Sequence, residues 1–245
     1  MITMRIYVLL ALFIAFAPYH ALASTTSSIS SPVVTEGETS FGARIGYSTA
    51  DNASSDDERL RSRLHIDHGF TDFYATRLVI AQDDRKGDSF EHASLTLENR
   101  FHFLKKATHG FDFGLKANYS YKDGDKKADD ISLQFYERIP YKRWEIRLGQ
   151  LFDHEIGEDS EPGITAQWRM QAIYPVTETF KAGIEGFHNF GNLRALSGYN
   201  DQSHTIGPVF KGKLTENLGY ETGYRVGISK SAPDHSLKFF VTQKF

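Results

Sequence analysis

Polar and apolar side chains alternate along most of this 245-residue chain, and this period of two limits the possible folds more than any other feature. In residues 41–47, Phe, Ala, Ile and Tyr stand at odd positions, and glycine or arginine at even ones. Successive side chains of a strand point to opposite faces, so the pattern predicts strands with one apolar face. Twelve segments of about ten residues share it, near the length of a membrane-crossing strand: 41–47, 59–67, 72–82, 92–103, 111–121, 130–138, 144–152, 164–174, 179–190, 203–214, 218–228 and 236–245.

The connections between these segments alternate in length. Short turns follow one end of the strands and long loops follow the other, as in a bacterial outer-membrane barrel. We therefore predict an all-β fold, a transmembrane antiparallel β-barrel of about 12 strands, with both termini on the periplasmic side because the strand number is even. The alternative is a soluble β-sandwich or a lipocalin-like barrel. In such a protein the polar face would be the solvent-exposed surface, and here that face is too charged to be explained in this way alone.

Two of the segments are irregular. Residues 73–81 do not distinguish an inward from an outward face. Pro208 lies inside segment 203–214 and cannot donate a hydrogen bond to a neighbouring strand, so we expect a β-bulge there.

Composition excludes several functions. The chain has no cysteine, which rules out disulfides, thiolate metal sites and cysteine nucleophiles. Its formal charge of −3 gives no general attraction to nucleic acid. Aromatic residues make up 13% of the chain and need apolar surroundings, which argues against disorder.

The N-terminus has the pattern of a secretory signal peptide. Arg5 is its single charge, residues 6–17 are apolar, and the small-x-small cleavage pattern ends at Ala23. We predict a signal peptide over 1–23, a flexible Ser/Thr-rich segment over 24–38, and the barrel over 39–245. An uncleaved N-terminal anchor is the alternative, although the apolar run is short for a membrane span.

The predicted polar faces carry many more bases than acids, whereas the long loops are acidic. A basic lumen of low dielectric concentrates anions, so we expect a porin or channel for passive diffusion of small anionic solutes. The residues expected to line the pore and set its selectivity are Arg59, Arg61, Arg63, Arg100, Arg147, Arg169 and Arg225. His65, His92 and His102 are expected on the same inward face.

Other functions remain open. The inward bases can pair with Glu98, Glu145, Glu185 and Glu221 and close a non-conducting structural or adhesion barrel that acts through its acidic loops.

A lipid-modifying enzyme would need a serine and a histidine near one rim, for which His188 with Asn189 and Ser203 with His204 are the candidates. No catalytic motif is visible, so we predict no enzymatic activity, and we predict no cofactor. The loop 153–161 is rich in carboxylates but lacks EF-hand spacing, so we assign no metal site.

The C-terminal segment resembles the assembly signal of bacterial outer-membrane proteins. Phe245 is terminal, and Val241, Phe239 and Leu237 precede it at alternate positions, although Gln243 replaces the usual aromatic residue. The resemblance implies that the barrel assembly machinery is a partner. We also expect contact with outer-membrane lipid and lipopolysaccharide, and none with nucleic acid.

Residues 201–208 and 232–238 resemble a porin-like family of bacterial outer-membrane proteins of unsettled role. Size and charge layout are also similar to those of the twelve-stranded porins for acidic sugars, the oligogalacturonate and sialic-acid channels. Both resemblances imply an outer-membrane barrel in a Gram-negative bacterium, and the second is an analogy that identifies no solute.

Overall fold

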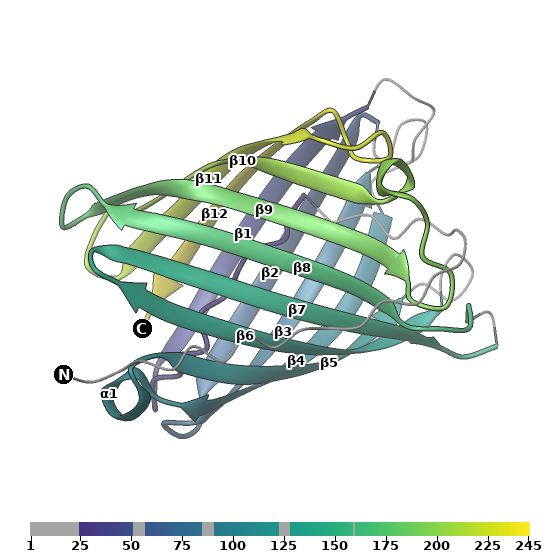
Figure 1. Cartoon of the computed structure of the whole chain (residues 1–245). Helices are drawn as coiled ribbons and strands as arrows, with labels where there is room; N and C mark the ends of the chain where they lie inside the picture. The colour runs from purple at the N-terminus through teal and green to yellow at the C-terminus, as the bar shows by residue number, and fades with distance from the viewer. Residues whose placement is uncertain (1–24, 51–56, 85–90, 123–127, 159) are drawn as a thin grey trace, which may run out of the picture.

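The computed structural model describes residues 25–50, 57–84, 91–122, 128–158 and 160–245, and shows twelve strands (Figure 1). Their bounds are β1 (Thr39–Thr49), β2 (Arg59–Gly69), β3 (Tyr74–Asp84), β4 (Glu91–Leu104), β5 (Asp112–Lys122), β6 (Asp129–Tyr141), β7 (Trp144–Ile156), β8 (Thr165–Pro175), β9 (Phe180–Asn192), β10 (Ser203–Lys213), β11 (Leu218–Gly227) and β12 (His235–Lys244). The predicted signal peptide, residues 1–23, lies outside the described residues.

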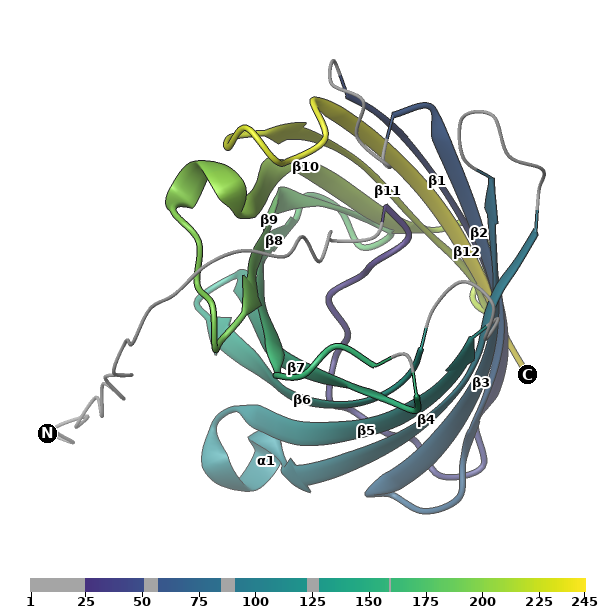
Figure 2. The same cartoon turned by 90° about the vertical axis from the view of Figure 1, so that its right-hand side faces the viewer.

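Each strand pairs antiparallel with its neighbours in sequence, and β1 pairs with β12 to close the barrel (Figure 2). At this seam Ser40 is opposite Lys244 and Thr49 is opposite His235. Closure leaves no strand edge unpaired, which a sheet in a bilayer requires. The predicted fold, an all-β closed antiparallel barrel of twelve strands, is confirmed.

The alternation places apolar side chains outside and polar side chains inside. In β2, Leu64 and Ile66 are 46% and 51% exposed, whereas His65 and Asp67 are 4% and 5% exposed. A soluble β-protein has the opposite arrangement, with apolar side chains in the interior. The same alternation settles the inward face of β3, where Ala75, Val79 and Ala81 are buried.

Two local features differ from the prediction. A β-bulge between Ala81 and Gln82 makes Gln82 the partner of His92 and leaves Ala93 unpaired with β3. His92 therefore shares the outward face of Gln82, and the expectation that it faces inward is wrong. Pro208 causes no bulge, because the register of β10 with β11 is the same before and after it. Only the pairing of β10 with β11 is interrupted next to Pro208.

The two ends of the barrel differ. At the turn rim, the strands are joined by the short connections 70–73, 142–143, 176–179 and 214–217 and by the connection 105–111, which contains the one-turn helix α1 (Lys106–His109). At the loop rim the connections have six to ten residues, more than the four short turns, and one holds the short 3₁₀ helix η1 (Tyr199–Asp201). No helix in the described ranges is long and apolar enough to cross a membrane.

Residues 25–35, which we call the lumen segment, run through the interior of the barrel before β1 begins (Figure 2). Thr26 and Ile29 are 0% and 1% exposed. Composition predicts a flexible lead-in here, but the structure gives the segment defined contacts with the barrel wall. The strand ends Thr39 and Lys244 do share the turn rim, as an even strand number requires, while Thr25 lies beside Gly46 in the loop-side half of the lumen.

Candidate functional site: the charged lumen

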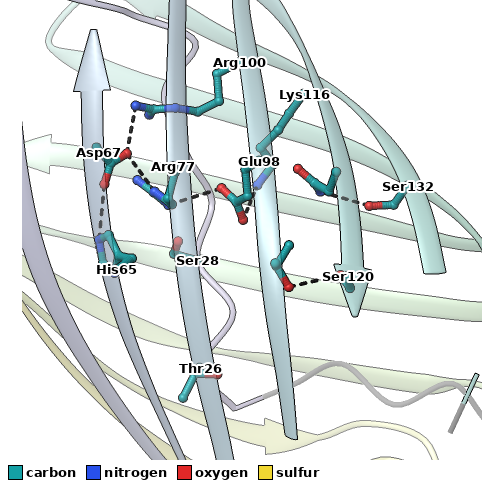
Figure 3. Close-up of polar contacts among 12 residues, drawn as sticks. Thr26, Ser28, His65, Asp67, Arg77, Glu98, Arg100, Lys116, Ser120 and Ser132 are labelled. Carbon is teal, nitrogen blue, oxygen red and sulfur yellow. Dashed lines mark hydrogen bonds and ion pairs between the residues drawn. The ribbon is translucent and has the colours of Figure 1, made fainter. Parts of the chain in front are cut away.

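Inward side chains of neighbouring strands form a continuous ion cluster on one wall, the β2–β5 cluster of Asp67, Arg77, Glu98, Arg100 and Lys116 (Figure 3). Asp67 accepts hydrogen bonds from Arg77 Nε at 2.7 Å and is 2.8 Å from Arg100 Nη2. Glu98 lies 3.6 Å from Arg77 and 3.4 Å from Lys116. Each carboxylate is thus shared between two cations.

A second cluster lies on the opposite part of the sheet, the β9–β12 cluster of Glu185, Lys211, Glu221, Arg225 and Lys238. Lys238 Nζ donates to Glu185 at 2.7 Å and to Glu221 at 2.6 Å. Glu221 also pairs with Lys211 at 2.8 Å, and Arg225 Nε is 3.9 Å from Glu185. The aromatic ring of Phe187 lies beneath Arg225, whose guanidinium carbon is 4.2 Å from the ring centroid.

Further ion pairs lie near the turn rim. Asp112 accepts from Arg138 at 2.8 Å and is paired with His102 at 3.0 Å. Glu145 pairs with Arg147 at 2.5 Å. The carboxylates predicted to line the lumen are therefore all within reach of a cation.

Four of the seven predicted selectivity residues lie within ion-pair distance of a carboxylate: Arg225, which is 3.9 Å from Glu185, and three with closer partners. Arg59 pairs with Asp83 at 2.5 Å near the loop rim, Arg100 pairs with Asp67, and Arg147 pairs with Glu145. Their positive charge is largely compensated, so their effect on a passing ion is reduced.

The remaining predicted residues are less compensated. Arg63 Nε and Arg169 Nε are buried and have no hydrogen-bond partner among the described residues, and the same holds for Nη1 of the ion-paired Arg225. Arg169 Nη2 donates to the neutral side chain of Gln167 at 2.9 Å. Arg61 takes an inward position of β2 between Arg59 and Arg63. A guanidinium with a spare donor on the lumen wall can bind an anion directly.

The sequence prediction missed three inward acids near the loop rim: Asp83, Asp130 and Asp153. Asp83 pairs with Arg59, and Asp130 pairs with Lys122 at 2.7 Å. Asp153 is opposite the buried Ser132 in the β6–β7 register and so faces the lumen. The predicted strands ended too early for Asp83 and Asp153 to be counted, although the alternation continues through both residues.

A small basic pocket of about 220 Å³ opens at the turn rim. Its lining includes Lys106, Arg138, Arg143, Lys181 and the single acid Glu145.

The residues considered for an enzymatic site do not form a serine–histidine pair. His188 and His204 are opposite each other on β9 and β10, with their Nδ1 atoms 3.2 Å apart. Ser203 precedes His204, so its side chain points to the other face of β10, and its hydroxyl has no hydrogen-bond partner among the described residues. In the part of the chain that the structure covers, no group of three His, Asp or Glu residues could hold a metal ion.

The closed barrel and its apolar outer face define an outer-membrane β-barrel with the fold of a channel. It is similar to the COG4313 outer membrane channel from Pseudomonas putida F1, with a TM-score of 0.66 and 14% identity over 86% of this chain and 97% of that chain. The NanC porin matches with a TM-score of 0.60 and 10% identity, over 84% of this chain and 100% of its own.

A KdgM porin in complex with disordered oligogalacturonate matches with a TM-score of 0.53 and 10% identity, over 85% of this chain and 98% of that chain. No family model and no curated protein match the sequence. The TM-scores establish a shared fold, and the low identities allow no conclusion beyond the fold. The expected similarity to the twelve-stranded acidic-sugar porins is confirmed at that level.

Proposed function

We propose that the protein is an outer-membrane channel for passive diffusion of small, preferably anionic solutes. The observation that carries this proposal is the unequal pairing of the lumen charges. The acids Asp67, Glu98, Glu185 and Glu221 all lie within ion-pair distance of a cation, whereas Arg63 and Arg169 have no carboxylate within that distance among the described residues. The excess positive charge favours anions over cations in the lumen.

The proposal includes the route to the membrane. Residues 1–23 would direct export and be removed, so that the mature chain begins at Ser24. The C-terminal segment would dock on the barrel assembly machinery through Leu237 and Phe239, which point outward, and through Phe245, which is 77% exposed. The loop rim would lie on the outer side of the membrane, against lipopolysaccharide. This function needs neither catalysis nor a cofactor.

Replacing Arg63 and Arg169 together by serine is expected to reduce anion selectivity, because both guanidinium groups are on the lumen wall and neither has a carboxylate within ion-pair distance among the described residues. The measurement is the reversal potential of single channels in a planar bilayer under a KCl gradient. We expect the double variant to shift it from the anion side toward zero.

The matched control is Arg194→Ser with Lys230→Ser, which removes the same charge from the loops between β9 and β10 and between β11 and β12. This control should keep the selectivity of the unmodified protein. Equal shifts in the two double variants would show that selectivity does not arise at the lumen arginines. A folded barrel without current in any variant would contradict the channel function.

The second candidate is a non-conducting structural or adhesion barrel. The observation in its favour is the lumen segment, which occupies space that a solute would need.

A further inference from the structure

The lumen segment is long enough to obstruct the whole channel. Eleven residues span at most about 36–40 Å when extended, more than the apolar band of about 25 Å around such barrels. From its start to its end, the segment contacts wall positions from the loop-side half of the lumen to the turn rim. Thr25 lies at Gly46, and Thr35 lies at Gly69, the last residue of β2.

The wall holds the segment through three arginines, of which Arg147 and Arg225 are among the predicted selectivity residues. Arg225 Nη2 donates to the carbonyl oxygen of Thr25 at 3.4 Å, and Arg147 Nη1 donates to that of Ile29 at 3.2 Å. Arg44 Nη1 donates to Ser28 Oγ at 2.9 Å and to the carbonyl oxygen of Thr26 at 3.5 Å. Arg225 and Arg44 come from β11 and β1, which both pair with β12, and Arg147 comes from the distant β7, so the segment bridges two separate parts of the wall.

The wall is also shaped to receive the segment. A Cβ atom added to Gly46 would lie 2.8 Å from Cβ of Thr25, and one added to Gly114 would lie 2.9 Å from Cβ of Pro32. The side chain of Ile29 packs in a buried contact with Phe187. Glycine at these inward positions leaves room that any larger residue would remove.

The hold on the segment is nevertheless weak. No residue of the lumen segment is charged, so the arginines bind it through neutral oxygens, and two of these hydrogen bonds are long, at 3.4 and 3.5 Å. Hydrogen bonds between a cation and a neutral oxygen are weaker than those between a cation and a carboxylate. The chain just after the segment is fixed more firmly. The backbones of Gly37 and Glu38 form hydrogen bonds with that of Gly69, and Glu38 pairs with Lys244 at 2.7 Å.

We propose that residues 25–35 are a built-in plug, which closes the lumen when bound to Arg44, Arg147 and Arg225 and must leave these residues for the channel to conduct. The inference rests on the proposed channel function. It adds a closed state that the protein forms with its own chain.

The first test is deletion of residues 25–35 with residues 1–24 and 36–245 retained. Single-channel conductance of the purified deletion variant and of the unmodified protein is compared in planar bilayers, after circular dichroism has shown that both are folded. We expect a several-fold higher conductance for the deletion variant. A folded variant with unchanged conductance would overturn the plug. A folded variant without current would overturn the channel function itself.

The second test holds the segment in place, and it decides the question if the deletion variant does not fold. The chain has no cysteine, so Thr25→Cys with Gly46→Cys introduces a single possible disulfide. The present Cβ separation is shorter than the usual 3.8 Å or so, and a small shift of the segment corrects it. We expect openings to disappear on oxidation and to return on reduction. Thr25→Cys alone and the reduced double variant serve as controls, and openings that persist in the cross-linked protein would contradict the plug.

Discussion

Replacing Asp67 by alanine is expected to lower the free energy of unfolding by roughly 3–5 kcal/mol, the usual cost of removing one partner of a buried ion pair. The side chain of Asp67 is 6% exposed and lies within 2.8 Å of both Arg77 and Arg100. Without it, two guanidinium groups remain with Glu98 as the only acid of the β2–β5 cluster. Urea unfolding in phospholipid vesicles, followed by fluorescence of Trp144 and Trp168, measures the loss.

Asp72→Ala is the matched control for this prediction. Asp72 lies in the turn between β2 and β3, where a hydrogen bond from Lys105 lowers the pKa of its exposed carboxyl group. Water screens such a pair, so its loss should leave stability almost unchanged. Adding Arg100→Ala to Asp67→Ala should restore part of the lost stability, because one uncompensated cation is then gone. Equal stability of Asp67→Ala and Asp72→Ala would mean that the cluster does not stabilise the wall.

Gly207→Ala is expected to destabilise the barrel by about 3 kcal/mol or more, at the upper end of the overpacking range. A Cβ atom at this position of β10 would lie 1.9 Å from the carbonyl oxygen of Tyr224 and 2.8 Å from Cα of Arg225. Both are backbone atoms of β11 and cannot rotate away, so the two strands must separate. Urea unfolding and the heat-dependent shift of the folded barrel in gel electrophoresis report the effect.

The control for this substitution lies in the same strand pair. A Cβ atom at Gly219 of β11 would meet only the carbonyl oxygen of Gly212, at 3.5 Å, which is an ordinary contact. Gly219→Ala should therefore fold and unfold like the unmodified protein. If Gly207→Ala did so as well, β10 and β11 would not approach each other as closely as the structure indicates.

The strands and their faces could be predicted because a membrane barrel repeats one rule along its whole length: outward residues meet lipid and inward residues meet charge. Arg63, Arg169 and Arg225 were placed on the lumen wall by that rule alone. The rule fails where the period of two is interrupted without a local signal. Nothing in the sequence around His92 marks the bulge that turns this residue outward.

The ion clusters were only partly predictable, because pairing depends on register. Alternation predicts that Arg77 and Glu98 both face inward. That they are direct neighbours follows only from the register of β3 with β4, which the sequence does not reveal. The lumen segment could not be predicted at all, since Ser/Thr-rich sequence is typical of a linker. Its location depends on distant glycines and arginines, such as Gly46 and Arg225, whose shared contact with Thr25 appears only when the barrel is closed.

The position of Thr25 has a practical consequence for work with purified protein. The chain enters the described structure inside the barrel, in its loop-side half, whereas Phe245 lies at the turn rim, where its backbone N–H donates to the carbonyl oxygen of Thr39. While the lumen segment is in place, an affinity tag retained ahead of Thr25 must either fill the lumen or emerge at the loop rim. Current recorded from such a fusion would report the tag as much as the protein, so a tag is better inserted in a loop, such as the one around Lys230.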